Sequence, residues 1–377
     1  MRILIYLYIT VTLFFATGCA KDDSDTAIPV SARTVMVYMA ANNSLSSDAY
    51  KNLNQMEEGF TGIDGKLIVY ARIFGQQPKL YEIVYDTSPE IKSKVLKTYN
   101  DHDSSDPDIM KMIFADMKNL APSHSYGAIL WSHATNWAPA NAGKISVRSF
   151  GDDNYSKMDV QVLKSALPSE LDFLIFDACS MASVEVLYEL RHVAPYILAS
   201  PTEVLSVGMP YHQINSLLYD TDVKKGLSAI AKAYIAYYEQ KSGLEQSATF
   251  SLVDTRAMAG LARETQLLLS QNPEVIPTIN RNNVQRLDLD PATPVKAYDF
   301  LDMFEKHFQP EKLQNLKTAI EKTVVYKAHT ANFLGKPILA FSGLSGYIPV
   351  KEEASLAPFY QSLSWSKDAG YDKLFWW

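Results

Sequence analysis

The chain has 377 residues, a formal net charge of −7 and 47% hydrophobic residues. This length accommodates one elaborated domain or two small ones, and the hydrophobic fraction is sufficient for a buried core. The mild acidity and the lack of a Lys/Arg cluster after the first residues exclude a protein that binds nucleic-acid phosphates through a basic face.

Residues 1–18 are typical of a lipoprotein signal peptide. The charged start Met1-Arg2 precedes an apolar stretch from Ile3 to Ala16, which is short for a membrane span. Ala16-Thr17-Gly18-Cys19 then resembles a lipobox, with Ala16 where Leu is usual. We expect lipid on Cys19 to anchor the chain, at about 0.8 kcal/mol per buried CH₂ group. An ordinary secretory signal cut nearby is the alternative.

Residues 19–32 are polar and acidic, and we expect them to form a solvated tether. The segment Lys21-Asp22-Asp23-Ser24-Asp25 resembles the export signal that directs lipoproteins of the Bacteroidetes to the outer cell surface. The sequence therefore predicts an outer-membrane lipoprotein, exposed on the cell surface or else on the periplasmic face. A simple spacer is the other interpretation of this segment.

Residues 33–377 are expected to fold, and their first half alternates apolar strands with helices. Such strands indicate a mostly parallel α/β sheet covered by helices on both faces. We expect strands at 34–40, 66–74, 79–85, 127–131, 146–151, 171–176 and 196–200, and helices at 46–58, 104–120, 160–167 and 183–191.

The second half is richer in helices and forms a C-terminal helical elaboration on the same sheet. Its central part, about 254–326, is predicted to be a helical insert. We expect helices at 223–240, 256–269 and 311–325, a strand at 248–253, and returning strands within 333–350.

Cys179 is the one cysteine left if Cys19 carries lipid, so no disulfide within the mature chain explains it. It follows the apolar run Leu174-Ile175-Phe176 and begins a turn toward a helix. A thiolate nucleophile needs a partner that manages protons and an oxyanion site of backbone N–H groups. We expect the Cys179 N–H to lie near the positive end of that helix. An inert buried cysteine is the alternative.

His133 is the histidine of the seven that directly follows an apolar strand, Ala128-Ile129-Leu130-Trp131-Ser132. Ligands of parallel sheets bind outside the carboxyl ends of the strands, where both His133 and Cys179 are expected. The pattern predicts a Cys–His catalytic pair, and a structural histidine is the other interpretation. The sequence contains no pair of His, Cys or Glu residues at a spacing typical of a metal site.

Four segments carry a resemblance to a known family: Thr34-Val35-Met36-Val37-Tyr38-Met39-Ala40-Ala41-Asn42-Asn43, Leu130-Trp131-Ser132-His133, Asp177-Ala178-Cys179-Ser180-Met181-Ala182-Ser183-Val184-Glu185 and Gly343-Leu344-Ser345-Gly346-Tyr347-Ile348-Pro349. With them the chain resembles the clostripain-like cysteine peptidases, relatives of caspases, legumains and gingipains. The resemblance spans nearly the whole mature chain and implies a caspase-like fold and a cysteine-type endopeptidase.

The resemblance also implies roles for individual residues. His133 matches the general acid or base and Cys179 the nucleophile. Asp177 matches the acidic floor of the S1 pocket, which would select Lys or Arg through a charge-assisted contact. Its alternative role is to cap the next helix. The oxyanion site would use the N–H groups of Cys179 and Ala134.

Two departures from the family pattern bear on this assignment. Ala134 stands where the family has Gly, and because Ala avoids positive φ the oxyanion site could be distorted. The loop 201–211 has Val207-Gly208-Met209 where an acidic residue is usual. Selectivity for basic residues would then rest mainly on Asp177, helped by Glu203.

Relatives often activate themselves by cutting the loop between the histidine and the cysteine. Here that loop is 138–149, with Lys144 as the more accessible bond and Arg148 as the second candidate. No redox or nucleotide cofactor is implied, although some relatives depend on calcium. Asp152-Asp153 could bind a cation or form a solvated turn.

The leading hypothesis is a lipid-anchored cysteine endopeptidase that cuts after Lys or Arg. Its partners would be peptide or protein substrates and the membrane, with no nucleic acid, and we expect a monomer. One alternative is a catalytically inactive lipoprotein that captures peptides in the same cleft. Another is an enzyme with an altered preference for the residue before the cleaved bond.

Overall fold

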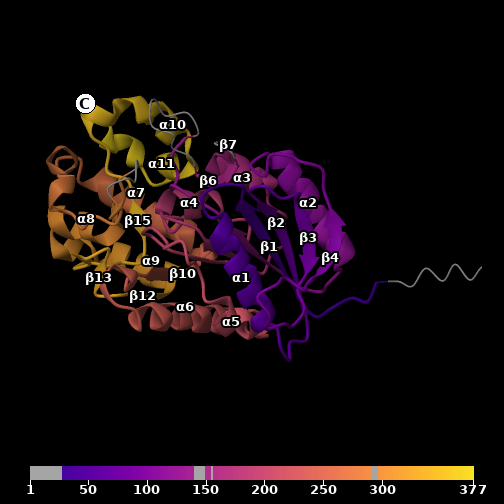
Figure 1. Cartoon of the computed structure of the whole chain (residues 1–377). Helices are drawn as coiled ribbons and strands as arrows, with labels where there is room; N and C mark the ends of the chain where they lie inside the picture. Colours follow the sequence, from indigo (N-terminus) through magenta and orange to yellow (C-terminus); the bar gives the residue numbers. More distant parts are fainter. Residues whose placement is uncertain (1–27, 140–148, 154–155, 291–295) are drawn as a thin grey trace, which may run out of the picture.

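The computed structural model describes residues 28–139, 149–153, 156–290 and 296–377 (Figure 1). The expected signal peptide, Cys19, most of the tether, and the candidate cleavage residues Lys144 and Arg148 lie outside the described residues. None of the described helices has the length and apolar character that a bilayer span requires.

A mixed sheet of nine strands runs through the described part of the chain, in the order β12-β10-β9-β8-β5-β1-β2-β3-β4. These strands are β1 (Thr34–Ala41), β2 (Lys66–Ile73), β3 (Lys79–Glu82), β4 (Lys94–Thr98), β5 (Tyr126–Trp131), β8 (Phe173–Asp177), β9 (Tyr196–Ala199), β10 (Thr249–Asp254) and β12 (Val324–His329). The five central strands, β9 to β2, run parallel. The two strands at each edge pair antiparallel. The predicted mostly parallel sheet is therefore confirmed.

Two hydrophobic cores lie on opposite faces of this sheet, and β1 shows why. All eight of its residues are buried, with Val35 and Val37 in one core and Met36 and Tyr38 in the other. Successive strand residues point to opposite faces, so a continuous apolar strand must be covered on both sides.

Helices cover both faces of the sheet. One core contains side chains of α1 (Ser46–Glu58), α5 (Tyr211–Ile214) and α6 (Val223–Glu239). The other core contains side chains of α2 (Pro107–Leu120), α3 (Val160–Ala166), α4 (Val184–Glu189), α7 (Met258–Gln271), α8 (Phe300–His307), α9 (Gln314–Thr323), α10 (Ala357–Ser362) and α11 (Ser364–Asp368). Figure 1 shows α5 and α6 along one side of the molecule, with α10 and α11 on the opposite side.

Two predicted features of the sheet edges differ from the structure. The helix expected at 311–325 ends at Thr323, and the chain returns to the sheet at once as β12. Strand β4 has no counterpart among the predicted strands, because its sequence Lys-Val-Leu-Lys-Thr is mostly exposed and lacks a buried apolar run. Edge strands have one unpaired side, so they tolerate such polar residues.

The returning strands predicted within 333–350 are only short pairs outside the main sheet. β13 (Asn332–Phe333) pairs with β14 (Lys336–Pro337), and β15 (Ser345–Gly346) pairs with β11 (Tyr298–Asp299). Proline cannot donate to a strand ladder, and glycine weakens a strand, so this Pro- and Gly-containing stretch does not extend. The predicted insert at 254–326 contains α7, α8 and α9.

Candidate active site

The register between β5 and β8 brings the two candidate catalytic side chains to one edge of the sheet. These strands are parallel neighbours, and Trp131 at the end of β5 lies opposite Asp177 at the end of β8. His133 and Cys179 each follow two residues later. Neighbouring strands lie about 4.8 Å apart. The structure therefore places two segments distant in the sequence side by side, at the carboxyl edge that the sequence predicted.

One cavity of about 290 Å³ is lined by both of these residues and by Asp177 and Glu203. The Cys179 side chain is only half-buried, so the sulfur is not sealed from solvent. A cavity with a thiol, an imidazole and a carboxylate on its walls matches the constellation expected for nucleophilic catalysis.

The sulfur of Cys179 is held by the backbone of Val204. Its Sγ lies 3.6 Å from the carbonyl oxygen of Val204, to which the thiol donates, and the Val204 N–H donates to Sγ at 3.3 Å. Burial, and then the carboxylates of Glu203, Asp177 and Asp290, raise the pKa of the thiol to about 12, although the Val204 N–H acts in the opposite direction. The thiol is therefore protonated at neutral pH in this state.

The turn after Cys179 is different from the one expected. Ser180 has a φ of 60°, and its N–H donates to the carbonyl oxygen of Thr202 at 2.7 Å. Helix α4 begins only at Val184, with Ser183 as its N-cap. Cys179 therefore lies four residues before the N-cap, and its N–H is not one of the first N–H groups of the helix. The residues between them pair with the 200–202 segment, where the Ala182 N–H donates to the carbonyl oxygen of Ser200 at 3.0 Å.

His133 carries a hydrogen bond that the sequence did not indicate. Its Nε2 lies 3.0 Å from the hydroxyl oxygen of Ser44, in the loop between β1 and α1. Burial lowers the pKa of the imidazole, and Lys157 lowers it further while Asp152 opposes this effect. The ring is therefore neutral at neutral pH and can accept a proton.

Ala134 takes part in a single antiparallel bridge with Phe150. The hydrogen bonds of this bridge run from the N–H of Thr135 to Ser149 and from the N–H of Gly151 to His133, so the bridge does not use the Ala134 N–H. The described non-glycine residues with positive φ are Asn136, Glu170, Ser180 and Leu334. Ala134 needs no positive φ, and this reason for a distorted oxyanion site does not apply. Its place as an oxyanion donor stays a prediction.

Asp177 forms a buried acidic wall of the cavity. Its Oδ2 accepts from the N–H of Met209 at 3.1 Å and from the hydroxyl of Tyr211 at 2.9 Å. Gly208, with a φ of +68°, passes so close that a Cβ there would lie 2.8 Å from Oδ2. Burial raises the pKa of Asp177 from 3.8 to about 6, and the two hydrogen bonds moderate the rise. The carboxylate is therefore mostly ionised at neutral pH.

Glu203 also lines the cavity, and its carboxylate binds the neighbouring chain segment. Oε2 accepts from the N–H of Leu289 and Oε1 from that of Asp290, both at 3.1 Å. These bonds hold the 289–290 segment against the cavity. A contribution of Glu203 to the S1 pocket stays a prediction.

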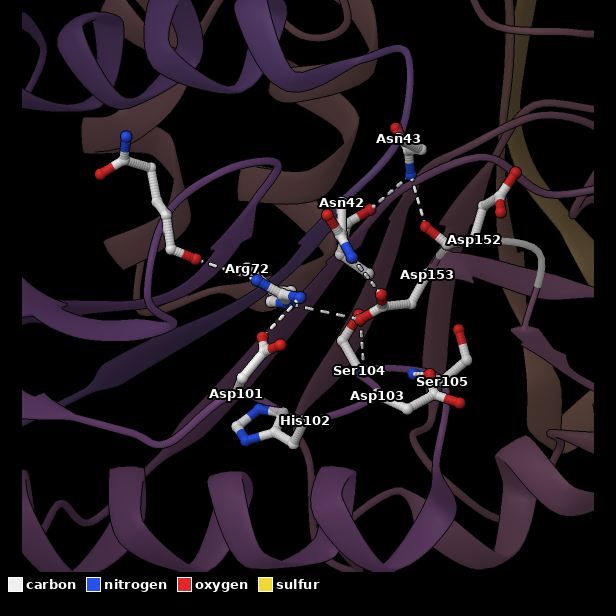
Figure 2. Close-up of polar contacts among 12 residues, drawn as sticks. Asn42, Asn43, Arg72, Asp101, His102, Asp103, Ser104, Ser105, Asp152 and Asp153 are labelled. Atoms are coloured by element: carbon white, nitrogen blue, oxygen red, sulfur yellow. Dashed lines mark hydrogen bonds and ion pairs between the residues drawn. The ribbon is translucent and has the colours of Figure 1, made fainter.

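Asp153 is buried at the end of β6, so it is not a solvated turn residue, and protein donors occupy its carboxylate. It is only 5% exposed, and its Oδ2 accepts from the N–H and hydroxyl of Ser104 at 2.7 and 2.8 Å. Arg72 Nε lies 3.5 Å from the same oxygen, and Asn42 donates to Oδ1 (Figure 2). Within the described residues no three His, Cys, Asp or Glu side chains are arranged as a metal site.

Asp152 has partners as well. Its carboxylate lies 3.4 Å from Lys157 Nζ, and its carbonyl oxygen accepts from the amide of Asn43 at 2.7 Å (Figure 2). These contacts and those of Asp153 fasten β6 (Phe150–Asp153) to the loop after β1, to Arg72 of β2 and to Ser104, which lies between β4 and α2. Because Gly151 of β6 donates to the carbonyl oxygen of His133 at 3.0 Å, the network also positions the imidazole.

Three further residues that lie at the site were not predicted from the sequence. Ser44 contacts His133, and Asp290 and Leu334 line the cavity. Ser44 lies four residues beyond the predicted strand end at residue 40, and this position offered a weak signal. Asp290 and Leu334 come from loops of the second half, whose approach to the cavity depends on tertiary packing alone.

Comparison with known proteins gives consistent matches. The model of the clostripain family of peptidases matches residues 37–334. The fold is similar to an inactive zymogen C11 protease from Parabacteroides distasonis, with a TM-score of 0.77 and 29% identity over 91% of this chain and 99% of that one. It is also similar to a secreted C11 cysteine protease from Bacteroides thetaiotaomicron in complex with an irreversible peptide inhibitor, with a TM-score of 0.77 and 27% identity over 90% and 99% of the two chains. A search of curated proteins gives no match.

The raised pKa of Asp177 predicts a pH-dependent cost of folding. Below pH 3.8 the carboxyl is protonated in both the folded and the unfolded chain, whereas between 3.8 and 6 the folded chain holds the proton more tightly. Stability contributed by this group therefore falls as pH rises to 6 and stays low above it. Asp177→Asn keeps an oxygen acceptor without the charge. Its advantage in unfolding free energy over the unsubstituted protein should grow by up to about 3 kcal/mol from pH 4 to pH 7.

Urea unfolding at the two pH values measures this difference. Asp64→Asn, at an exposed loop position, is the control and should change both curves alike. An advantage of Asp177→Asn that is the same at pH 4 and pH 7 would contradict the assigned burial of the charge.

Proposed function

The chain belongs to the clostripain family of cysteine endopeptidases, and we propose that it hydrolyses peptide bonds after Lys or Arg, with Cys179 as nucleophile and His133 as acid and base. The observation that carries this proposal is the Asp177 carboxylate, which is 5% exposed and lies on the wall of the cavity that also contains the thiol. A desolvated carboxylate is strongly selective for a cation, and it accepts a guanidinium or ammonium group at a charge-assisted distance.

In the proposed reaction the neutral imidazole of His133 takes the thiol proton as sulfur attacks the carbonyl carbon. The oxyanion that forms is stabilised by the N–H groups of Cys179 and Ala134. His133 then gives the proton to the leaving amine, and the C–N bond breaks to leave a thioester on Cys179. Water, deprotonated by His133, hydrolyses the thioester and returns the thiol. Ser44 holds the imidazole at Nε2, which favours one orientation of the ring.

Substitutions at Cys179 and Asp177 test this function. Cys179→Ala should abolish hydrolysis of arginyl- and lysyl-coumarin peptides. Asp177→Asn still accepts from Met209 and Tyr211, so it should fold, but kcat/KM for arginyl substrates should fall by about a hundredfold or more because the cation loses its partner. In the unsubstituted enzyme KM for these substrates should rise as pH falls through 6, since Asp177 becomes neutral there.

The measurement is the fluorimetric kcat/KM for a set of peptidyl-coumarins that differ in the residue before the coumarin. An Asp177→Asn variant with unchanged preference for Arg would refute the S1 assignment. Hydrolysis after a different residue type would instead support the alternative of an enzyme with an altered preference for the residue before the cleaved bond. If neither hydrolysis nor alkylation of Cys179 by iodoacetamide occurs, even after limited trypsin treatment, the chain is a binding protein.

We infer that the intact chain is latent. A thiol with a pKa of about 12 provides little thiolate at neutral pH, so the surroundings of Cys179 must change before it attacks efficiently. We propose that cleavage in the 138–149 loop triggers activation, because both ends of this loop lie close to the histidine. The loop begins five residues after His133 and ends at Ser149, whose carbonyl oxygen accepts from the N–H of Thr135 at 3.1 Å. A cut there would free the two ends on either side of this bond to move apart, close to His133.

Replacing the candidate cleavage residues tests this activation. Lys144→Ala should leave one chain with low activity toward arginyl-coumarin, because the accessible bond is lost, whereas Arg148→Ala should still be cut. Intact-mass measurement of purified, incubated samples gives the products, and Cys179→Ala is the control for cutting by a contaminant. A single uncut chain with full activity would rule out activation by cleavage.

We also propose that the protein is an outer-membrane lipoprotein held by lipid on Cys19. The arrangement of the folded part supports this, because Ser31 pairs with Ser123 and Thr34 begins β1 at the amino end of the parallel strands. The catalytic residues follow the carboxyl ends of those strands. An anchor before residue 28 would therefore leave the cavity facing away from the membrane, toward soluble substrates.

Cys19→Ser tests the anchor in cells that express the full chain. Metabolic labelling with a palmitate analogue should mark the unsubstituted protein and not the variant, and the variant should move from the membrane to the soluble fraction. Lys21→Ser is a matched control that should keep the label. An unlabelled protein that is released in both forms would indicate an ordinary secretory signal.

A further inference from the structure

A leucine occupies a left-handed backbone position at the edge of the cavity. Strands β13 and β14 are joined by a two-residue turn, Leu334-Gly335, with φ values of 46° and 75°. Two positive φ angles in succession are typical of type I′ turns, which favour Asn-Gly. Leucine is unfavourable at such a position because its Cβ meets the backbone, and it lacks the short polar side chain that makes Asn tolerable.

The hairpin is held in place by contacts that leave the turn little freedom. The N–H of Leu334 donates to the hydroxyl of Ser247 at 2.8 Å. Phe333 is fully buried with Leu289 and Ile338, and Lys336 Nζ donates to the carbonyl oxygen of Leu289 at 2.8 Å. Unfavourable backbone angles persist only where the surroundings impose them, and they concentrate at functional sites.

The Leu334 side chain is half-buried and lines the cavity together with Val204, Leu205 and Cys179. These residues supply apolar surface next to the acidic wall formed by Asp177. The position of Leu334 therefore exposes an apolar group to the cavity at a turn where a polar residue would be favoured by the backbone.

The strand order indicates which half of a substrate would meet this surface. β8 with Cys179 lies between β5, which leads to His133, and β9, which leads to the 203–205 segment. His133 protonates the leaving amine, so that half of the substrate lies toward β5. The acyl half, including the residue before the basic one, then extends toward the 203–205 segment and Leu334.

We propose that Leu334 is a specificity residue that contacts the side chain immediately preceding the basic residue of the substrate, and that it selects an apolar side chain there. This inference rests on the proposed cleavage after Lys or Arg. Under this proposal, the unfavourable backbone conformation at Leu334 is retained because the leucine side chain recognises the substrate. Burying one apolar side chain against another discriminates by about tenfold to a hundredfold between Leu and Gly in a substrate.

Leu334→Asn separates recognition from backbone conformation. Because Asn-Gly suits the turn, the variant should unfold at a temperature about 1 to 2 °C higher than the unsubstituted protein. Its kcat/KM ratio for peptidyl-coumarins ending in Leu-Arg over those ending in Gly-Arg should fall from tenfold or more toward one. The activity toward Gly-Arg substrates should fall less than the activity toward Leu-Arg substrates, since glycine offers no side chain for Leu334 to contact.

Leu244→Asn is the matched control. Leu244 is 63% exposed and lies beside Gly335 on the outside of the same turn, away from the residues that line the cavity. This variant should leave the Leu-Arg to Gly-Arg ratio as it is.

Three outcomes would overturn the inference. They are equal cleavage of both substrates by the unsubstituted enzyme, an unchanged ratio in Leu334→Asn, and a lower unfolding temperature in that variant. Absence of cleavage after any basic residue would instead refute the proposed function, and the inference would fail with it.

Discussion

The hydrogen-bonded register between β5 and β8 decides the chemistry of this molecule. Pairing Trp131 with Asp177 places His133 and Cys179 at equal distances beyond two neighbouring strand ends. A shift by one residue would turn every side chain of one strand to the other face of the sheet. Because both faces are packed with apolar side chains, that shift would disrupt two cores at once. The folding of the sheet and the assembly of the site therefore depend on the same constraint.

Burial controls the charges around this edge. The same low-polarity surroundings raise the pKa values of Cys179 and Asp177 and lower that of His133. For the imidazole this is useful, because a neutral ring accepts a proton. For the thiol it means that the attacking form is scarce, whereas the carboxylate keeps its charge through donors from Met209 and Tyr211. The site thus holds a neutral imidazole and an ionised carboxylate beside a protonated thiol.

The sequence predicts the parallel centre of the fold well and its periphery poorly. Runs such as residues 34–40 and 171–176 are mostly apolar, so the strands and the positions of His133 and Cys179 follow from the local pattern. β4 is a mostly exposed edge strand and β12 a half-buried one, and their polar residues resemble those of loops or helix ends. The start of α4 agrees with the helix predicted from residue 183, but the left-handed turn at Ser180 between Cys179 and this helix was not predicted, because serine rarely adopts that conformation. Leu334 reaches the site only through the packing of a distant hairpin.

The bond between the Tyr211 hydroxyl and Asp177 ties the acidic wall of the cavity to the neighbouring helix α5. Tyr211 is fully buried at the first position of α5, and Asp177 accepts from its hydroxyl. Loss of that acceptor would leave the hydroxyl stranded in an apolar interior, at a cost of about 1–3 kcal/mol. A replacement of Asp177 that offers no acceptor would therefore be tolerated best together with Tyr211→Phe, whereas Asn at position 177 keeps the acceptor. The chemistry of this cavity wall and the packing of α5 are thus linked through one hydroxyl group.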